Sequence, residues 1–250
     1  MPFVDTHLHL EELEHPGAAV TEAVEAGVGR LITMGTDLAT STGALALAEQ
    51  RREVYAAVGH QPMNREAPDL DALRSLAAHE KAVAIGEVGV DGGHTELAAL
   101  PLQVEWFASL CDLALELGLP VCVHTRDSAE EVFGVLRARP GLTGVMHYFS
   151  LDGAWAGRFL ELGFHLSFAG LLTRPSRQEL REVARTCPPD RLLLETDAPF
   201  GTPHGRRAKQ NRPAWLLDTA KVVAELRRLS LEELAAIEET NAKSLFSKLG

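Results

Sequence analysis

The chain has 250 residues, of which 46% are hydrophobic, and carries a formal net charge of −11 at pH 7. This length and apolar content suffice for one large core, so we expect a single domain over residues 1–250. The negative charge argues against a protein that coats nucleic acid through a broad basic face, although local binding stays open.

The chain lacks an apolar run long enough to span a bilayer, and its first residues do not form a secretory signal. We therefore expect a cytoplasmic protein without membrane contact. The three cysteines are widely separated, with no CxxC pair, so neither a disulfide framework nor a zinc knuckle is indicated.

Apolar, β-rich runs alternate along the whole chain with longer segments of helical period. Eight strands are predicted, at residues 3–8, 30–35, 54–60, 82–89, 119–126, 143–150, 164–170 and 191–199. The segment 101–118 is typical of the intervening helices, because it opens on Pro101 and closes on Gly118. Two further helical stretches follow the eighth strand.

A doubly wound open sheet also alternates in this way, but the number of strands favours a closed barrel. The predicted fold is therefore α/β, a TIM (β/α)8 barrel with additional C-terminal helices. In such barrels the active site lies where the strands end and their βα loops begin.

Histidines and carboxylates stand at these predicted strand ends. They are His7 and His9 at the first strand, Glu87 at the fourth, His124 at the fifth, His147 at the sixth and Asp197 at the eighth. Residues i and i+2 of a strand share a face, so we expect each of the pairs His7/His9, His124/Arg126 and Glu195/Asp197 to point inward together.

Imidazoles and carboxylates that converge in a barrel mouth carry a high desolvation cost unless something pairs them. Divalent metal would supply that pairing. Four histidines and two carboxylates exceed what one tetrahedral ion needs, so two ions that share a bridging carboxylate are predicted.

Each residue also has a plainer interpretation. A lone HxH on a strand is more often packing or surface chemistry, and Asp197 before Ala198 and Pro199 could cap a loop. Asp5 and Glu195 are expected to orient neighbouring groups, because ligating histidines usually have such partners. The remaining histidines, His15, His79, His94 and His165, have no comparable context.

A basic segment lies at residues 204–212, with four cations and no acid. It could be a solvated loop, or it could receive an anionic ligand.

Several short motifs now indicate a family. They are DTHLH at 5–9, GEVGVD at 86–91, Gln103, VHTRD at 123–127, His147 in HYFS, ETDAP at 195–199, and Asn211 with Pro213. In order and spacing, over essentially the whole length, the chain resembles the TatD family of metal-dependent deoxyribonucleases, which are amidohydrolase-like barrels.

This resemblance implies a role for each matching residue. His7, His9, Glu87 and Asp197 would hold one ion, and Glu87, His124 and His147 would hold the second, with Glu87 as the bridge. Both carboxylates are expected to be catalytic, with Asp197 accepting a proton from the attacking water. The ions could be zinc, magnesium or manganese.

The implied reaction is metal-assisted hydrolysis of DNA phosphodiesters, in the 3′-to-5′ direction and on single-stranded or frayed ends. Arg126, Gln61, Lys209 and Arg207 are the expected substrate contacts, and the basic segment becomes a surface that admits DNA. Aromatic platforms for bases are few, so weak and transient DNA binding by a monomer is expected.

The chain departs from the family pattern in four places. Gln61 stands where histidine is usual before proline, Leu151 replaces a glycine, Arg212 replaces a glutamate, and Gly92 replaces a tyrosine. None of these is a predicted metal ligand, so the departures concern substrate choice.

Two other functions stay open. One is hydrolysis of another ester or amide with the same ions, such as D-aminoacyl-tRNA deacylation. The other is a non-catalytic, metal-stabilised scaffold, which would be expected to have lost part of the six-residue set.

Overall fold

Eight parallel strands form one sheet in sequential order, β1 to β8, and helices on its outside connect them. The computed structural model describes residues 2–206 and 210–250. The strands are β1 (Phe3–Leu8), β2 (Val28–Met34), β3 (Val54–Val58), β4 (Ala82–Asp91), β5 (Val121–Arg126), β6 (Gly144–Met146), β7 (His165–Phe168) and β8 (Leu192–Leu194).

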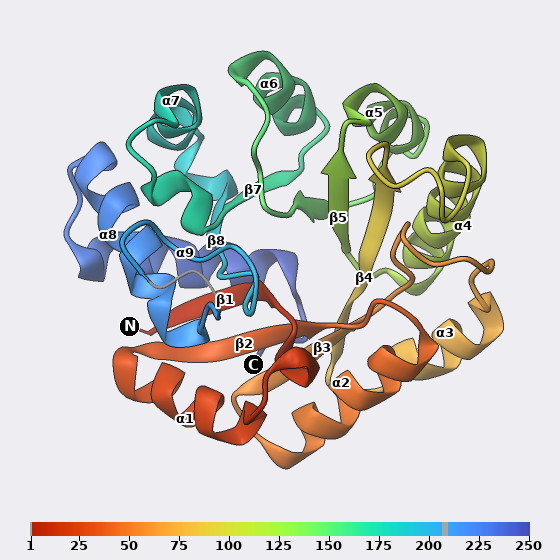
Figure 1. The fold of residues 1–250 in the computed structure, drawn as a ribbon, viewed down its shortest axis with the longest axis horizontal. Helices are drawn as coiled ribbons and strands as arrows, with labels where there is room; N and C mark the ends of the chain where they lie inside the picture. Colours follow the sequence, from red (N-terminus) through yellow and green to blue (C-terminus); the bar gives the residue numbers. More distant parts are fainter. Residues whose placement is uncertain (1, 207–209) are drawn as a thin grey trace.

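The helices are α1 (Pro16–Ala26), α2 (Leu38–Gln50), α3 (Leu70–Ala77), α4 (Leu100–Leu117), α5 (Ala129–Arg137), α6 (Gly153–Glu161), α7 (Gln178–Thr186), α8 (Leu216–Arg227) and α9 (Leu231–Leu245). They surround the sheet in the order of the chain (Figure 1). The predicted TIM barrel with additional C-terminal helices is therefore confirmed.

Local sequence signals set the helix ends. Asp37 and Thr40 form a reciprocal cap at the start of α2, in which the Asp37 side chain accepts from the backbone N–H of Thr40. Ser230 and Glu233 form a cap of the same kind on α9. Helix α4 ends at Gly118, whose φ of 64° lies in the left-handed region that favours glycine.

The barrel closes between β1 and the segment after β8. The backbone N–H of Asp197 donates to the His7 carbonyl at 2.9 Å, and the N–H of His9 donates to the Ala198 carbonyl at 2.7 Å. Closure therefore positions three of the predicted site residues next to one another.

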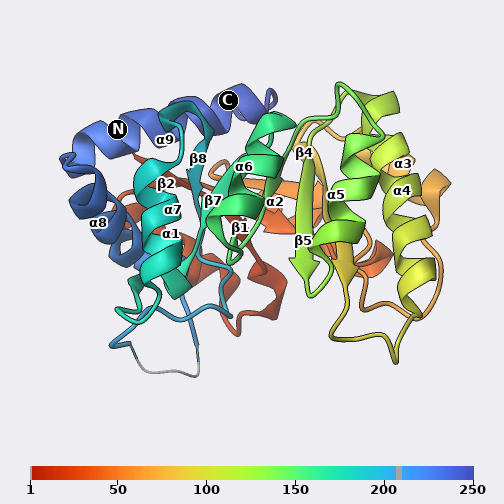
Figure 2. The same ribbon diagram turned by 90° about the horizontal axis from the view of Figure 1, so that it is seen from above.

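Helix α9 covers one end of the barrel. Ala242 and Leu245 of α9 and the following Phe246 pack on inward residues of the strands, such as Val4 and Ile32. Figure 2 shows α9 across the end opposite to the loops that follow the strands. Apolar side chains thus fill one end of the barrel, and the predicted active site can lie only at the other end.

Five of the eight strands are shorter than predicted. Those expected at 119–126 and 164–170 span only Val121–Arg126 and His165–Phe168. The expected strands 54–60, 143–150 and 191–199 end instead at Val58, Met146 and Leu194. After the last two, Tyr148 and Asp197 adopt positive φ values of 45° and 57°, which turn the chain out of the strand. Glu195 and Asp197 therefore lie on a loop, and the prediction that they share one face of a strand is wrong.

Among the described residues, no helix has both the length and the apolar character to cross a membrane.

Candidate metal centre

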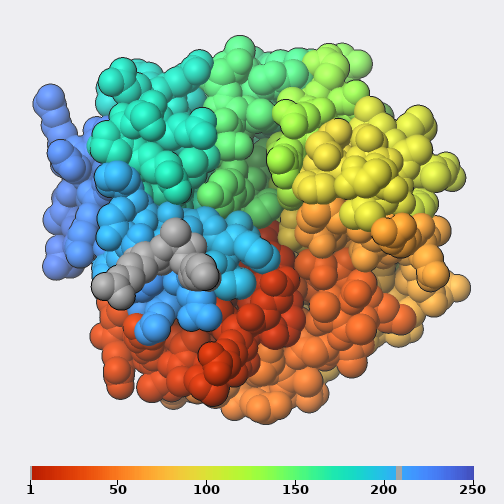
Figure 3. Space-filling view, viewed as in Figure 1, coloured from red at the N-terminus to blue at the C-terminus, as the bar shows by residue number. Residues whose placement is uncertain are grey.

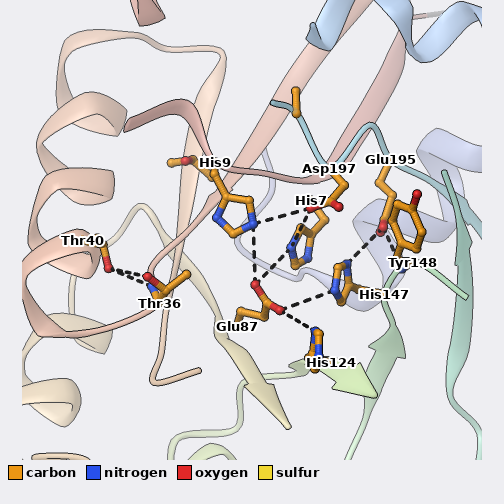
Figure 4. A network of polar contacts seen from close by, with 12 residues as sticks. His7, His9, Thr36, Thr40, Glu87, His124, His147, Tyr148, Glu195 and Asp197 are labelled. Carbon is orange, nitrogen blue, oxygen red and sulfur yellow. Dashed lines mark hydrogen bonds and ion pairs between the residues drawn. The ribbon is translucent and has the colours of Figure 1, made fainter. Parts of the chain in front are cut away.

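The structure brings the six predicted metal-binding side chains together at the loop end of the barrel. His7 lies in β1 and His9 directly follows it, Glu87 lies in β4 and His124 in β5. His147 and Asp197 lie just beyond β6 and β8. Figure 4 shows the four histidines gathered around Glu87, with Asp197 next to His7 and His9.

One oxygen of Glu87 faces two histidines. Its Oε1 lies 3.0 Å from Nδ1 of His124 and 3.5 Å from Nε2 of His147. The Glu87 side chain is almost fully buried, so water does not compete for this oxygen.

The other oxygen of Glu87 faces the second pair of histidines. Its Oε2 lies 3.6 Å from Nε2 of His7 and 3.6 Å from Nε2 of His9. Asp197 completes this group, because its Oδ1 lies 3.5 Å from His9 Nε2 and 3.9 Å from His7 Nε2. One carboxylate therefore stands between two sets of ligand-type atoms.

The protonation of the cluster reflects this crowding. Burial alone would raise the pKa of Glu87, but the close imidazoles of His124, His147 and His7 hold it well below its ordinary value. Burial and the neighbouring His147 lower the pKa of His7 to about 3. Burial opposes the charged form of His9 as well, but Asp197 and Glu87 raise its pKa to about 9.

Several buried nitrogens of the cluster lack a partner. Within the described residues, both ring nitrogens of His7 and Nδ1 of His9 make no hydrogen bond. Leaving buried polar atoms unpaired costs about 1–3 kcal/mol each. Ligand atoms of three overlapping groups lie within 4.8 Å of one another, namely His7/His147/Asp197, His7/His9/Glu87 and Glu87/His124/His147. The residues present therefore fit divalent metal.

Two further carboxylates hold parts of the cluster in place from outside. Glu195 Oε1 lies 3.1 Å from His147 Nδ1 and accepts from the backbone N–H of Tyr148 at 2.7 Å. Asp5 accepts from the backbone N–H and the hydroxyl of Thr196, which fixes the chain between Glu195 and Asp197. Asp5 and Glu195 thus occupy the positions expected of orienting groups.

Asp91 is a site residue that the sequence argument missed. Its Oδ2 lies 2.9 Å from Nε2 of His124 and 3.1 Å from Nδ1 of His94. Gln103 holds the Asp91 backbone, because its Oε1 accepts from the Asp91 N–H at 2.8 Å. Both Asp91 and Gln103 stand in motifs that match the family, and this was the available signal. His94, which had no assigned context, lies in this network.

A cavity of about 680 Å³ opens above the cluster. Its walls include Glu87, His124, His147 and Asp197, and also Gln61 and Arg126. The space-filling view shows the surface hollowed near the centre of this face, beside the light-blue segment around residue 200 (Figure 3). Two of the four expected substrate contacts therefore line the same cavity as the cluster.

The other two expected contacts, Arg207 and Lys209, lie outside the described residues. The remaining cations of the basic segment are paired: Arg206 Nε donates to Asp218 at 2.7 Å, and Arg212 lies 3.1 Å from Glu22. Both guanidinium groups also stack on Trp215. Arg206 and Arg212 are therefore engaged with the protein, and the role of this segment in admitting DNA stays a prediction.

Three departures from the family pattern have structural consequences. Leu151 lines the cavity, as Gln61 does. His60, next to Gln61, packs edge-on against Trp106 and does not line this cavity. A Cβ at Gly92 would lie 2.3 Å from the Asp127 carbonyl oxygen, so this backbone admits no side chain there.

The fold and the site together define the class of protein as a metal-dependent hydrolase with a barrel fold. Residues 4–247 match the family model described as TatD related DNase, and the chain belongs to this family. The chain is 38% identical to the uncharacterized metal-dependent hydrolase YabD of Bacillus subtilis, over 97% of this chain and 98% of the relative. It is also 36% identical to the uncharacterized metal-dependent hydrolase YcfH of Escherichia coli K12, over 98% and 96%.

Solved structures agree with this placement. The crystal structure of YJJV, a TatD homolog from Escherichia coli K12, superposes with a TM-score of 0.92 and 32% identity, covering 98% of each chain. A hydrolase TatD family protein from Entamoeba histolytica has a TM-score of 0.88 at 20% identity, with 98% of each chain covered. This second likeness concerns the fold.

Proposed function

We propose that this metal-dependent hydrolase cleaves phosphodiester bonds of DNA as a 3′-to-5′ exonuclease that acts on single-stranded or frayed ends. The observation that carries the proposal is Glu87, whose two carboxylate oxygens face separate histidine pairs in a cavity that also holds Arg126. A phosphodiester is an anion that needs charge stabilisation on both the attacking and the leaving side.

Two divalent ions fit the cluster, with zinc, magnesium and manganese as candidates. His7, His9, Glu87 and Asp197 would hold one, and Glu87, His124 and His147 the other. When bound, such ions lower the pKa of water and neutralise the charge that develops on the phosphate.

The protein supplies the proton acceptor and the substrate contacts. Asp197 takes the proton of the attacking water at its carboxylate, because it lies at the cavity wall with 14% of its side chain exposed. The exposed Arg126 donates to a nonbridging phosphate oxygen, and Gln61 donates from the segment that follows β3. A cavity of this size suits a chain terminus better than an intact duplex.

The test uses 3′-labelled single-stranded DNA incubated with metal-loaded protein, with and without a chelator. Stepwise shortening that stops with the chelator would support the proposal. Full metal content with intact DNA and cleaved D-aminoacyl-tRNA would favour an ester hydrolase. Protein that binds metal and cleaves neither substrate would indicate a scaffold.

A further inference from the structure

A second cavity, of about 880 Å³, adjoins the metal centre. It lies between the loop that follows β7 and the loop that follows β8, and its walls include Arg174, Arg177 and Thr202. Tyr148 and Phe200 line this cavity and the cavity above the cluster as well. The two spaces therefore share a wall of two aromatic side chains.

The shared wall is well defined. The backbone of Tyr148 is fixed by its hydrogen bond to Glu195, and a Cβ at Gly201 would come within 2.8 Å of the Tyr148 ring. Phe200 is 50% exposed, the highest value among the large hydrophobic side chains that the structure describes as exposed. Its ring centroid lies 5.7 Å from that of His9, so an aromatic face is offered to solvent beside the metal centre.

The charge of the second cavity is positive in a chain of net charge −11. Arg174 and Arg177 are both exposed, and no carboxylate of the described residues lies within ion-pair distance of either guanidinium. The exposed Arg185 and Arg206, by contrast, are paired with acids. Two cations in one cavity without acidic partners among the described residues attract an anion electrostatically.

The loop that carries these arginines is held in place. The Thr173 hydroxyl donates to the Gly170 carbonyl at 2.6 Å and accepts from the backbone N–H of His204 at 2.7 Å. A Cβ at Gly170 would lie 2.0 Å from the Gly201 carbonyl oxygen, so the two loops are in direct contact. Figure 1 shows these teal and light-blue segments side by side. The arginines are therefore presented from a fixed backbone.

We propose that the second cavity binds the neighbouring nucleotide of a single-stranded nucleic acid whose scissile phosphodiester lies at the metal centre. Arg174 and Arg177 hold the adjacent backbone phosphate, and Phe200 stacks on a base between the two cavities. This inference rests on the proposed function. The combination of unpaired cations with an exposed aromatic ring is what a single strand requires, and it recognises no particular base.

The test compares the metal-loaded protein with its Arg174→Gln/Arg177→Gln variant. The substrates are a single-stranded hexathymidylate and bis(4-nitrophenyl) phosphate, a diester too small to fill both cavities. The ratio of the KM for the hexanucleotide to the KM for the small diester is expected to rise about tenfold, since two charge-assisted contacts are lost. The matched control, Arg137→Gln/Lys221→Gln, removes the same charge on α5 and α8, and its ratio should equal that of the parent protein.

Direct binding separates this inference from the proposed function. Fluorescence anisotropy of labelled hexathymidylate should show weaker binding by the double variant, with a salt slope smaller by about 1. Phe200→Ala should weaken binding about fivefold or more, and Phe200→Trp should retain it. If the parent protein binds the strand by these criteria and hydrolyses neither substrate, the proposed function fails. If hydrolysis occurs and the arginine variant matches the parent in KM ratio, affinity and salt slope, the second cavity is not a nucleotide site.

Discussion

Asp91 Oδ2 lies 2.9 Å from Nε2 of His124, on the side of the imidazole ring away from Glu87. A carboxylate in this position keeps the proton on Nε2, which leaves Nδ1 free to bind a metal ion. The same Asp91 accepts from the Gly93 N–H through Oδ1 at 2.8 Å, so its orientation is fixed.

Asp91→Asn is expected to weaken the binding of one ion about 10- to 100-fold. An amide in place of the carboxylate either loses the Gly93 hydrogen bond or turns an N–H toward His124, which moves the ring proton to Nδ1. Metal affinity measured by chelator competition checks this. Asp112→Asn, at the exposed partner of Arg139, is the control. Equal affinity in both variants would mean that Glu87 alone orients His124.

His124→Ala and Glu87→Ala should differ in metal stoichiometry. If Glu87 contributes to both ion sites, its loss should empty both, whereas loss of His124 should empty one and leave the barrel folded. Phosphodiesterase activity should fall at least about 100-fold in each case, because charge stabilisation at the phosphate is lost. Elemental analysis gives the stoichiometry, and circular dichroism confirms the fold. The same metal content in the two variants would argue against Glu87 as a shared ligand.

Glu238 gives a pH dependence of stability. Burial raises the pKa of this α9 carboxyl well above its ordinary value, against the hydrogen bond that it accepts from the Val4 N–H, and nearby Asp5 adds to the rise. The folded state therefore keeps a proton that the unfolded chain releases above about pH 4.3. Stability contributed by this group is present below that pH and is lost as the pH rises toward the folded pKa.

The substitution Glu238→Gln removes this difference in protonation between the folded and unfolded states, because an amide does not titrate. The free energy of unfolding of the variant should thus improve relative to the parent protein between about pH 5 and about pH 8. Denaturation midpoints at the two pH values give the measurement, with the exposed Glu232→Gln on the same helix as control. Parallel pH profiles for parent and Glu238→Gln would show that Glu238 does not titrate in this way.

Phe246→Ala should destabilise the barrel by about 3–5 kcal/mol, because this fully buried ring fills the barrel end that α9 covers. Leu115→Ala, at a side chain that is 38% exposed, should cost much less. Urea denaturation measures both. Because Phe246 lies at the end opposite to the βα loops, activity per folded molecule should be retained. A large loss of activity with unchanged stability would contradict this separation.

The sequence was sufficient for the barrel and for the convergence of the six polar residues. Both follow from periodicity, since parallel strands in a barrel place their carboxyl ends at one rim. His7 and Glu87 could be located in this way without any knowledge of side-chain contacts.

Contacts between residues on different elements were beyond such reasoning. The pairing of Arg212 depends on Glu22 in α1, and that of Arg206 on Asp218 in α8. The turn at Asp197 depends on a left-handed backbone conformation that the local sequence does not predict. Asp91 was missed because β4 runs to Asp91, two residues beyond the predicted end of this strand.

The position of Glu87 also has a thermodynamic consequence. Its carboxylate is a single charge that faces two sets of ligand-type atoms, so a cation held beside His7 and His9 would shift the protonation of His124 and His147. By linkage, the reverse effect has the same size. If each half holds a cation, the two binding equilibria would be coupled, and the affinity of either half would be defined only when the occupancy of the other is stated.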